Sequence, residues 1–157
     1  MKQKDLLLLA NLRQNARETL TKISKKTKIP ISTIFDRLKY HENTIIKKHT
    51  TIIDFSKLGF STRVTLTLKV NKDDKENIRD FLTKHQNVNS VYKINNGYDF
   101  LIEGIFRNIK DLEEFLENLE DKHKIKSKQV YYIVEDIQRE DFMSDANIVE
   151  MIYNQTI

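Results

Sequence analysis

The fold of the first part of the chain is decided by Ile29-Pro30-Ile31-Ser32-Thr33-Ile34-Phe35-Asp36-Arg37-Leu38. Proline disfavours helix for the residue before it, so a helix begins at Ser32 or in the turn just before it. Ile34, Leu38 and His41 then recur at steps of three and four residues, which is the spacing of one helical face. This helix should stop near Asn43, a residue type that tolerates left-handed backbone.

Two helices are predicted before it. Residues 4–12 contain a leucine-rich helical face, and Thr19 can cap a second helix in which Leu20, Ile23 and Thr27 share a side. Two short helices separated by a tight turn, after a leucine-rich first helix, are typical of a helix-turn-helix. A plain three-helix bundle would use the same leucines as core, and helix counting alone does not separate the two.

The third helix would carry the candidate DNA contacts on its polar face. Serine and threonine near a helix start reach phosphates or base edges, and arginine can pair with guanine in two places. The residues on this face are Ser32, Thr33, Asp36, Arg37, Lys39 and Tyr40. Residues 45–53 are rich in β-branched side chains and predict a small hairpin or wing, where Lys47 and Lys48 would touch the DNA backbone.

Charge is distributed unevenly along the 157 residues. The whole chain has 27 Lys and Arg against 23 Asp and Glu, a net charge of +4. Residues 1–60 hold 13 basic and 5 acidic side chains, for a net +8, whereas residues 61–157 hold 14 and 18, for a net −4. This asymmetry favours double-stranded DNA as the partner of the first part, and so favours the helix-turn-helix over the plain bundle.

Composition excludes several other classes of protein. With no cysteine there are no disulfides, no thiolate zinc site and no thiol catalysis. The longest apolar run, residues 6–10, is too short to span a membrane, and no signal peptide precedes the first charges. We therefore expect a cytoplasmic protein with no membrane partner.

The second half alternates in a way that predicts a ferredoxin-like domain. Period-two patterns indicate strands at residues 63–70, 88–94, 100–106 and 129–137, and amphipathic patterns indicate helices at 75–85 and 109–119. The order βαββαβ places two helices on one face of a four-stranded antiparallel sheet, so the chain as a whole is α+β. The open face of such a sheet must be covered, and a second copy of the chain is the simplest cover.

These residues resemble the Lrp/AsnC, or feast/famine, family of transcription regulators over roughly residues 4–140. The similarity is carried by four segments in order: Ser32-Thr33-Ile34-Phe35-Asp36-Arg37-Leu38, then Ile45-Ile46-Lys47-Lys48 running into Ile52-Ile53-Asp54, then Lys57-Leu58-Gly59-Phe60, and Gly97-Tyr98-Asp99. The resemblance implies a winged helix-turn-helix followed by a ferredoxin-like domain of the RAM type. It also implies a sequence-specific DNA-binding homodimer that pairs sheet to sheet and assembles further, for example into an octamer.

The resemblance further implies a small effector, commonly an amino acid, bound near the glycine-containing turn. The corresponding positions are Asn95, Asn96, Gly97, Tyr98 and Asp99. We expect no catalytic residue, no metal and no cofactor, because the chain has no cysteine and no clustered histidine. The chain departs from the family pattern where Lys28 takes the place of a turn glycine, where one residue is lost around Asn43-Thr44, and where Asn96 takes the first place of the effector turn.

We expect three segments: residues 1–60 as the DNA-binding domain with wing and linker, 61–141 as the effector and oligomerisation domain, and 142–157 as a tail. Ile148, Met151 and Ile152 recur at helical spacing in this tail, which predicts a partner helix or a swapped or frayed arm.

Two alternative functions remain open at this stage. The lysines of residues 22–28 would suit an architectural, chromatin-like DNA binder with little sequence preference. A stand-alone ferredoxin-like enzyme would need acid–base chemistry from Asp99, Glu103 and His85 or His123, but isolated histidines and surface carboxylates are weak candidates for that role.

Overall fold

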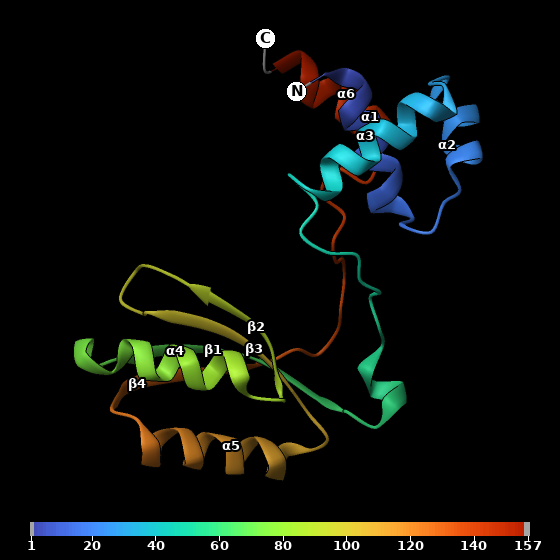
Figure 1. Cartoon of the computed structure of the whole chain (residues 1–157). Helices are drawn as coiled ribbons and strands as arrows, with labels where there is room; N and C mark the ends of the chain where they lie inside the picture. The colour runs from blue at the N-terminus through green and yellow to red at the C-terminus, as the bar shows by residue number, and fades with distance from the viewer. Residues whose placement is uncertain (1, 156–157) are drawn as a thin grey trace. The chain divides into compact units, whose positions relative to one another are not determined.

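The computed structural model describes residues 2–155, and the chain divides into two compact units. The helical unit consists of residues 1–51 and 137–157, and the sheet unit consists of residues 52–136 (Figure 1). The helices of the helical unit are α1 (Gln3–Gln14), α2 (Leu20–Thr27), α3 (Ile31–Glu42) and α6 (Ala146–Gln155). None of the helices in this described part of the chain is long and apolar enough to cross a membrane.

The three predicted helices of the first segment are confirmed. Thr19 caps α2 as expected, because its Oγ1 accepts a hydrogen bond from the Lys22 amide at 3.3 Å. Helix α3 begins after Pro30 and ends at Glu42, directly before Asn43. The core of this unit is a buried cluster contributed by all three helices and the turn before α3, comprising Leu8, Ile23, Ile29 and Ile34.

Lys28, in the turn between α2 and α3, has left-handed backbone with φ of 60°. A side chain with a Cβ is strained in this region, whereas glycine adopts it freely. Lys28→Gly is therefore expected to stabilise the helical unit by about 0.5–1 kcal/mol, the relief of strain being partly offset by the greater freedom of glycine in the unfolded chain. Thermal melting followed by circular dichroism measures the change. Lys28→Ala is the matched control, because it removes the same side chain but keeps the Cβ, and equal melting of the two variants would contradict the prediction.

The predicted hairpin between the units is not formed. Residues 46–54 contain neither helix nor strand, although Lys47 and Lys48 are exposed as expected. The β-branched side chains favour extended backbone, but an isolated pair of strands gains too little burial to be stable without a further surface to pack on. A short 3-10 helix, Phe55–Leu58, closed by Gly59 with φ of 85°, leads on into the sheet unit.

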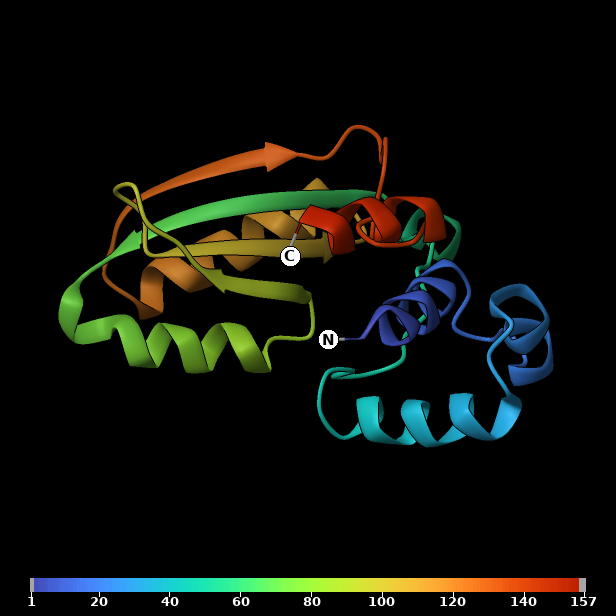
Figure 2. The ribbon, with the colours of Figure 1, turned by 90° about the horizontal axis from the view of Figure 1, so that it is seen from above.

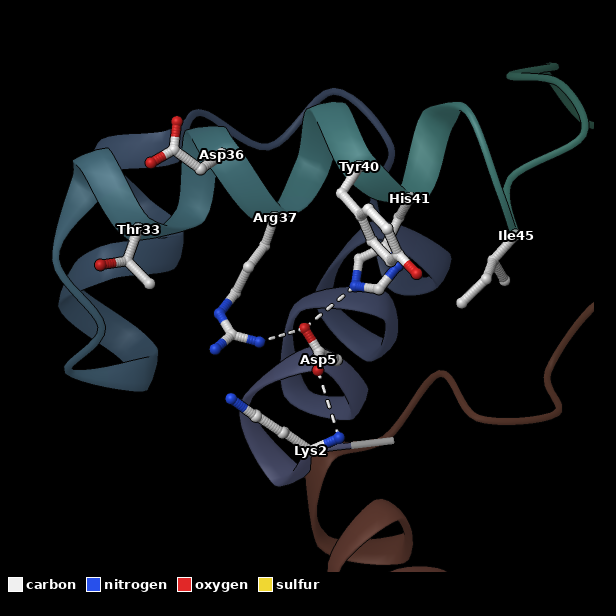
Figure 3. Close-up of a pocket in the computed structure, with 8 residues that line it drawn as sticks. All are labelled: Lys2, Asp5, Thr33, Asp36, Arg37, Tyr40, His41 and Ile45. Atoms are coloured by element: carbon white, nitrogen blue, oxygen red, sulfur yellow. Dashed lines mark hydrogen bonds and ion pairs between the residues drawn. The ribbon is translucent and has the colours of Figure 1, made fainter.

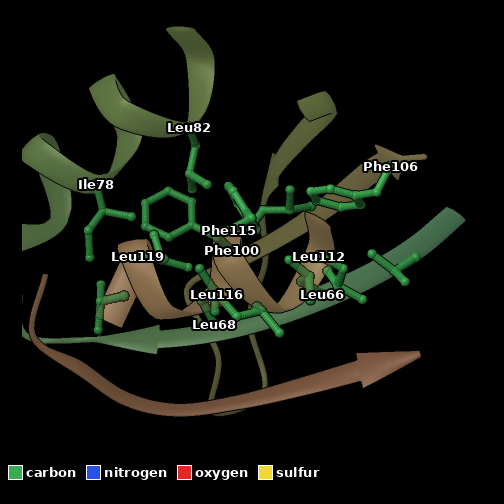
Figure 4. Packing of buried hydrophobic residues seen from close by; sticks show 13 residues of the cluster. Leu66, Leu68, Ile78, Leu82, Phe100, Phe106, Leu112, Phe115, Leu116 and Leu119 are labelled. Carbon is green, nitrogen blue, oxygen red and sulfur yellow. The ribbon is translucent and has the colours of Figure 1, made fainter. Parts of the chain in front are cut away.

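The ferredoxin-like architecture of the sheet unit is confirmed. Its elements are β1 (Thr62–Val70), α4 (Lys75–Lys84), β2 (Val88–Lys93), β3 (Phe100–Phe106), α5 (Ile109–Lys122) and β4 (Ile125–Tyr132), with a short 3-10 turn, Lys72–Asp74, before α4. The strands are paired antiparallel in the order β2-β3-β1-β4. Figure 4 shows how side chains of α4 and α5 meet those of β1 and β3 to form the core.

The last strand lies earlier than the predicted 129–137. β4 ends at Tyr132, and one further backbone bond joins the Ile133 amide to the Arg63 carbonyl. Beyond it the chain leaves the sheet, which exposes the apolar side chains of Val134 and Ile137 almost completely. In the register that pairs Val64 with Tyr132, residues 135–137 would extend beyond Thr62, where β1 begins, so they have no strand of this sheet to pair with.

The tail returns to the helical unit and packs on α1, and α6 lies alongside α1 in both views (Figure 1 and Figure 2). Val149 is fully buried in a cluster with Leu6 and Ala10, and Met143 packs against its edge. The predicted stripe does not make this contact: Ile148 and Met151 are exposed, and the side chain of Ile152 lies outside the described residues. The structure therefore divides the chain at residues 51/52 and 136/137, where the sequence placed boundaries at 60/61 and 141/142.

Candidate nucleic-acid interface and effector turn

Helix α3 presents three different sides. Ile34 and His41 are buried against the rest of the helical unit, with Leu38 packed against the same core. Since successive residues are 100° apart around a helix, the opposite side falls on the exposed residues Ser32, Asp36 and Lys39. This outward side contains three of the residues that the sequence assigned to DNA.

The flanks of α3 carry the remaining expected contacts. Tyr40 is exposed and Thr33 half-buried on the flank that borders α1. The other flank presents Phe35, whose side chain is 56% exposed and which sequence reasoning did not include. Its spacing of three residues from Ser32 and four from Lys39 is the signal that could have identified it.

Arg37 extends toward α1, where its Nη1 makes an ion pair with Asp5 (Figure 3). His41 Nε2 lies 3.1 Å from the same Asp5 oxygen, and the other carboxylate oxygen accepts a hydrogen bond from the Lys2 amide at 3.2 Å. Among the described residues, Arg37 Nε and His41 Nδ1 are buried without a hydrogen-bond partner. The guanidinium of Arg37 is thus bound to α1. The sequence does not predict this contact, because Asp5 lies 32 residues earlier.

Burial and hydrogen bonding act in opposite directions on Asp5. Burial opposes its ionisation, but the hydrogen bonds from Arg37 and His41 and the charge of Arg37 outweigh this and hold the pKa of Asp5 below its ordinary value. The carboxylate is therefore charged at neutral pH and holds α3 against α1.

An open pocket of about 620 Å³ adjoins this ion pair. Four of the expected DNA contacts, from Thr33 to Tyr40, border it together. Its lining consists of Lys2, Asp5, Thr33, Asp36, Arg37, Tyr40, His41 and Ile45. Asp36 points away from Asp5 in Figure 3, so the two carboxylates are not paired there.

Exposed lysines accompany α3 in sequence and in the fold. Lys22, Lys25, Lys26 and Lys28 of α2 and its turn are all exposed, and Lys26 pairs with Glu18 at 2.8 Å.

The returning tail changes the net charge that the sequence suggested for the DNA-binding part of the chain. Residues 1–51 hold 12 basic and 4 acidic side chains and residues 137–157 hold one and four, so the helical unit has a net +5 and the sheet unit a net −1. The charge asymmetry survives in a weaker form.

The expected effector turn joins β2 to β3. Asn96 and Gly97 both have left-handed backbone, with φ of 62° and 91°, so asparagine supports the turn as expected. The structure leaves Asn95 and both of these residues exposed and Tyr98 half-buried.

Asp99 is held by the end of the sheet. Its carboxylate accepts a hydrogen bond from the Val70 amide at 2.9 Å and makes an ion pair with Lys75. Burial disfavours the charge, but the contact with Lys75 and the bond from Val70 prevail and lower the pKa of Asp99. The side chain of Asp99 therefore serves the fold.

The candidate catalytic groups are held by separate partners. Glu103 accepts a hydrogen bond from Asn89 at 2.6 Å and pairs with Arg63, whereas His123 Nδ1 lies 3.3 Å from Asp74. Among the described residues no three His, Asp or Glu side chains are grouped so as to hold a metal ion.

Comparison with known proteins gives a consistent picture. The family model of the Lrp/AsnC ligand binding domain matches residues 63–141. The HTH-type transcriptional regulator FL11 of Pyrococcus horikoshii is 31% identical over 114 residues, covering 72% of this chain and 76% of that protein. An uncharacterised HTH-type transcriptional regulator of Pyrococcus furiosus is 24% identical over 139 residues, covering 88% of this chain and 93% of that protein.

Solved structures share the fold at low identity. A transcriptional regulator of Neisseria meningitidis in complex with L-Met superposes with a TM-score of 0.82 at 19% identity, covering 88% of this chain and 93% of that one. AsnC of Escherichia coli superposes with a TM-score of 0.78, also at 19% identity, covering 88% and 95%. A helix-turn-helix followed by a RAM-type domain is therefore the architecture of this chain.

Proposed function

This chain belongs to the Lrp/AsnC family of transcription regulators, and from that membership we propose that it binds specific DNA sequences in the cytoplasm as a dimer or a larger oligomer. Like its relatives, which are named transcriptional regulators, it is a regulator of transcription and not an enzyme. The observation that carries the proposal is the outward side of α3, polar and exposed, in a helical unit with a net charge of +5.

The proposed interface uses the outward side of α3 and the flank that borders the pocket. Ser32, Asp36 and Lys39 enter the major groove, with Thr33 and Tyr40 on the flank toward the pocket. Lys47 and Lys48, in the irregular segment after α3, bind phosphates. Arg37 contributes as a positioning residue, because pairing with guanine would take it from Asp5 and leave that carboxylate without its main partner.

Selection from a pool of random duplexes, followed by titration at several salt concentrations, tests this proposal. The wild type should prefer the selected duplex to random DNA by much more than tenfold. The double variant Lys47→Gln/Lys48→Gln is expected to weaken binding to all duplexes alike and to lower the slope of log K against log salt by about 2.

Lys110→Gln in the sheet unit removes another exposed lysine and should leave both quantities unchanged. If affinity for random and selected duplexes agreed within about tenfold, the architectural function would replace the specific one.

We propose that the open face of the sheet forms the dimer interface. Helices α4 and α5 cover one face of the sheet. Thr67, Leu101 and Tyr131 lie on the opposite face, which these two helices leave open. Light scattering of the purified chain should give at least the mass of a dimer and, with further assembly, that of an octamer. A monomeric mass across the concentration range would contradict this part of the proposal.

An amino-acid effector is proposed at the turn of residues 95–99. The matched family model is that of a ligand binding domain, and the fold is that of a regulator solved with L-Met. Thermal melting with each of the twenty amino acids in excess should raise the melting temperature for at least one, because a ligand of the native state stabilises it. Tyr98→Ala should abolish that increase, and the absence of any increase for the wild type would contradict the proposal.

A further inference from the structure

Phe35 is a large apolar side chain exposed on the helix that we assign to the major groove. More than half of its surface is accessible, and Ile31, one turn earlier on the same edge, is nearly half exposed. Single exposed apolar residues are common on protein surfaces. An exposed phenyl ring beside Ser32 and Lys39 on a DNA-facing helix is a more specific arrangement.

The core of the helical unit does not need Phe35. The buried cluster is formed by Leu8, Ile23, Ile29 and Ile34 and is bordered by Leu12, Leu20 and Leu38, and Phe35 is absent from it. The second cluster, between α1 and α6, does not include it either. The ring is therefore available to an outside partner.

The surroundings of Phe35 define the chemistry of that partner. Lys39 follows one turn later on the same helix, and although Asp36 adjoins Phe35 in sequence, the helical unit as a whole has a net charge of +5. A partner must then be anionic overall and yet offer an apolar group at the depth of the α3 side chains. The major groove of DNA has this combination, because phosphates border it and the 5-methyl group of thymine projects into it.

We propose that Phe35 packs on the 5-methyl group of one thymine in each half-site and thereby makes the chain select thymine there. This inference rests on the proposed function. Polar side chains read thymine only through its O4 acceptor, whereas the methyl group is recognised by apolar contact. Phe35 would be a specificity-determining residue distinct from the polar contacts of α3.

Replacing thymine with deoxyuridine tests the contact by removing one methyl group at a time. The probe is the duplex selected by the wild-type chain from the random pool, in which each thymine is replaced in turn by deoxyuridine, which lacks only the methyl group. Wild type is expected to bind about 15-fold more weakly when one particular thymine is replaced in both half-sites, which is about fourfold for each of the two methyl groups lost. Phe35→Ala should bind the unmodified duplex with about the affinity of wild type on that deoxyuridine duplex and show no further loss.

Two variants serve as controls for this experiment. Lys39→Gln should weaken binding to every duplex while keeping the dependence on the methyl group, and Ile31→Ala should keep it as well. Circular dichroism of Phe35→Ala should match wild type, because an exposed ring contributes little to folding.

The outcomes separate this inference from the proposed function. If the wild type selects no duplex at all, the proposed function is wrong. If it selects a duplex but no deoxyuridine substitution weakens binding, or Phe35→Ala remains as sensitive as wild type, the role of Phe35 is overturned and the proposed function stands.

Discussion

Replacing Asp5 with alanine is expected to destabilise the helical unit by about 3 kcal/mol, the lower end of the range for removing one partner of a buried ion pair. The variant would leave Arg37 and His41, both with a further unpartnered nitrogen, facing an apolar residue. The lower end applies because the Arg37 side chain keeps 23% of its exposure and so retains some hydration. Hydrogen exchange of peptides from α1 and α3, measured on the full chain, reports the loss.

Asp36→Ala is the matched control for Asp5→Ala. It removes an exposed carboxylate from the same pair of helices. The free energy of opening derived from the exchange rates should change by less than about 0.5 kcal/mol. If the two variants exchanged alike, the ion pair would not stabilise the unit.

Acid should weaken the contribution of Asp5. A carboxyl group whose pKa is lower in the folded state than in the unfolded chain stabilises the fold fully above its unfolded pKa, here near its ordinary value of 3.8. The contribution is lost as the pH falls below that value and through the folded pKa. Asp5→Asn should remove this part of the acid dependence, and an unchanged acid profile would contradict the assignment.

Val149→Asp is expected to destabilise the packing of α6 on α1 by about 2–4 kcal/mol, because it places a charge among apolar side chains. Val149 is fully buried between Leu6 and Ala10. The penalty is limited by release of the tail, so the expected result is faster hydrogen exchange in α1 together with proteolytic cleavage in residues 137–145.

Met151→Asp tests whether the effect comes from burial. Met151 lies two residues later on the same helix and is 63% exposed, so the same new charge should be tolerated there. Equal exchange and equal cleavage of the two variants would show that the tail does not pack on α1 in solution.

The sheet unit was predictable because its signals are local. The alternating Val64, Leu66 and Leu68 are fully buried, as period two requires for one face of β1. The helical stripe of α5 is buried in the same way, in the residues Leu112, Phe115, Leu116 and Leu119. Each pattern can be recognised from the residues of one strand or one helix, without knowing what packs against it.

The features that sequence reasoning missed depend on partners far away in the chain. Arg37 makes an ion pair with Asp5, which lies 32 residues earlier in the chain. Arg13 donates a hydrogen bond to the carbonyl of Glu140, which lies 127 residues later. Nothing in the immediate neighbourhood of either arginine indicates such a contact. The candidate DNA contacts were therefore predicted as members of a helix face, but the commitment of Arg37 to α1 was not.

The double crossing of the chain between the two units has a consequence for its synthesis. Domains usually fold as units as they emerge from the ribosome, amino-terminal ones first. Here Val149 must emerge before it can cover Leu6 and Ala10, so the helical unit is completed only after the whole sheet unit has been made. A nascent chain therefore completes the sheet unit before the helical unit, because the packing of α6 on α1 waits until the residues of α6 have emerged.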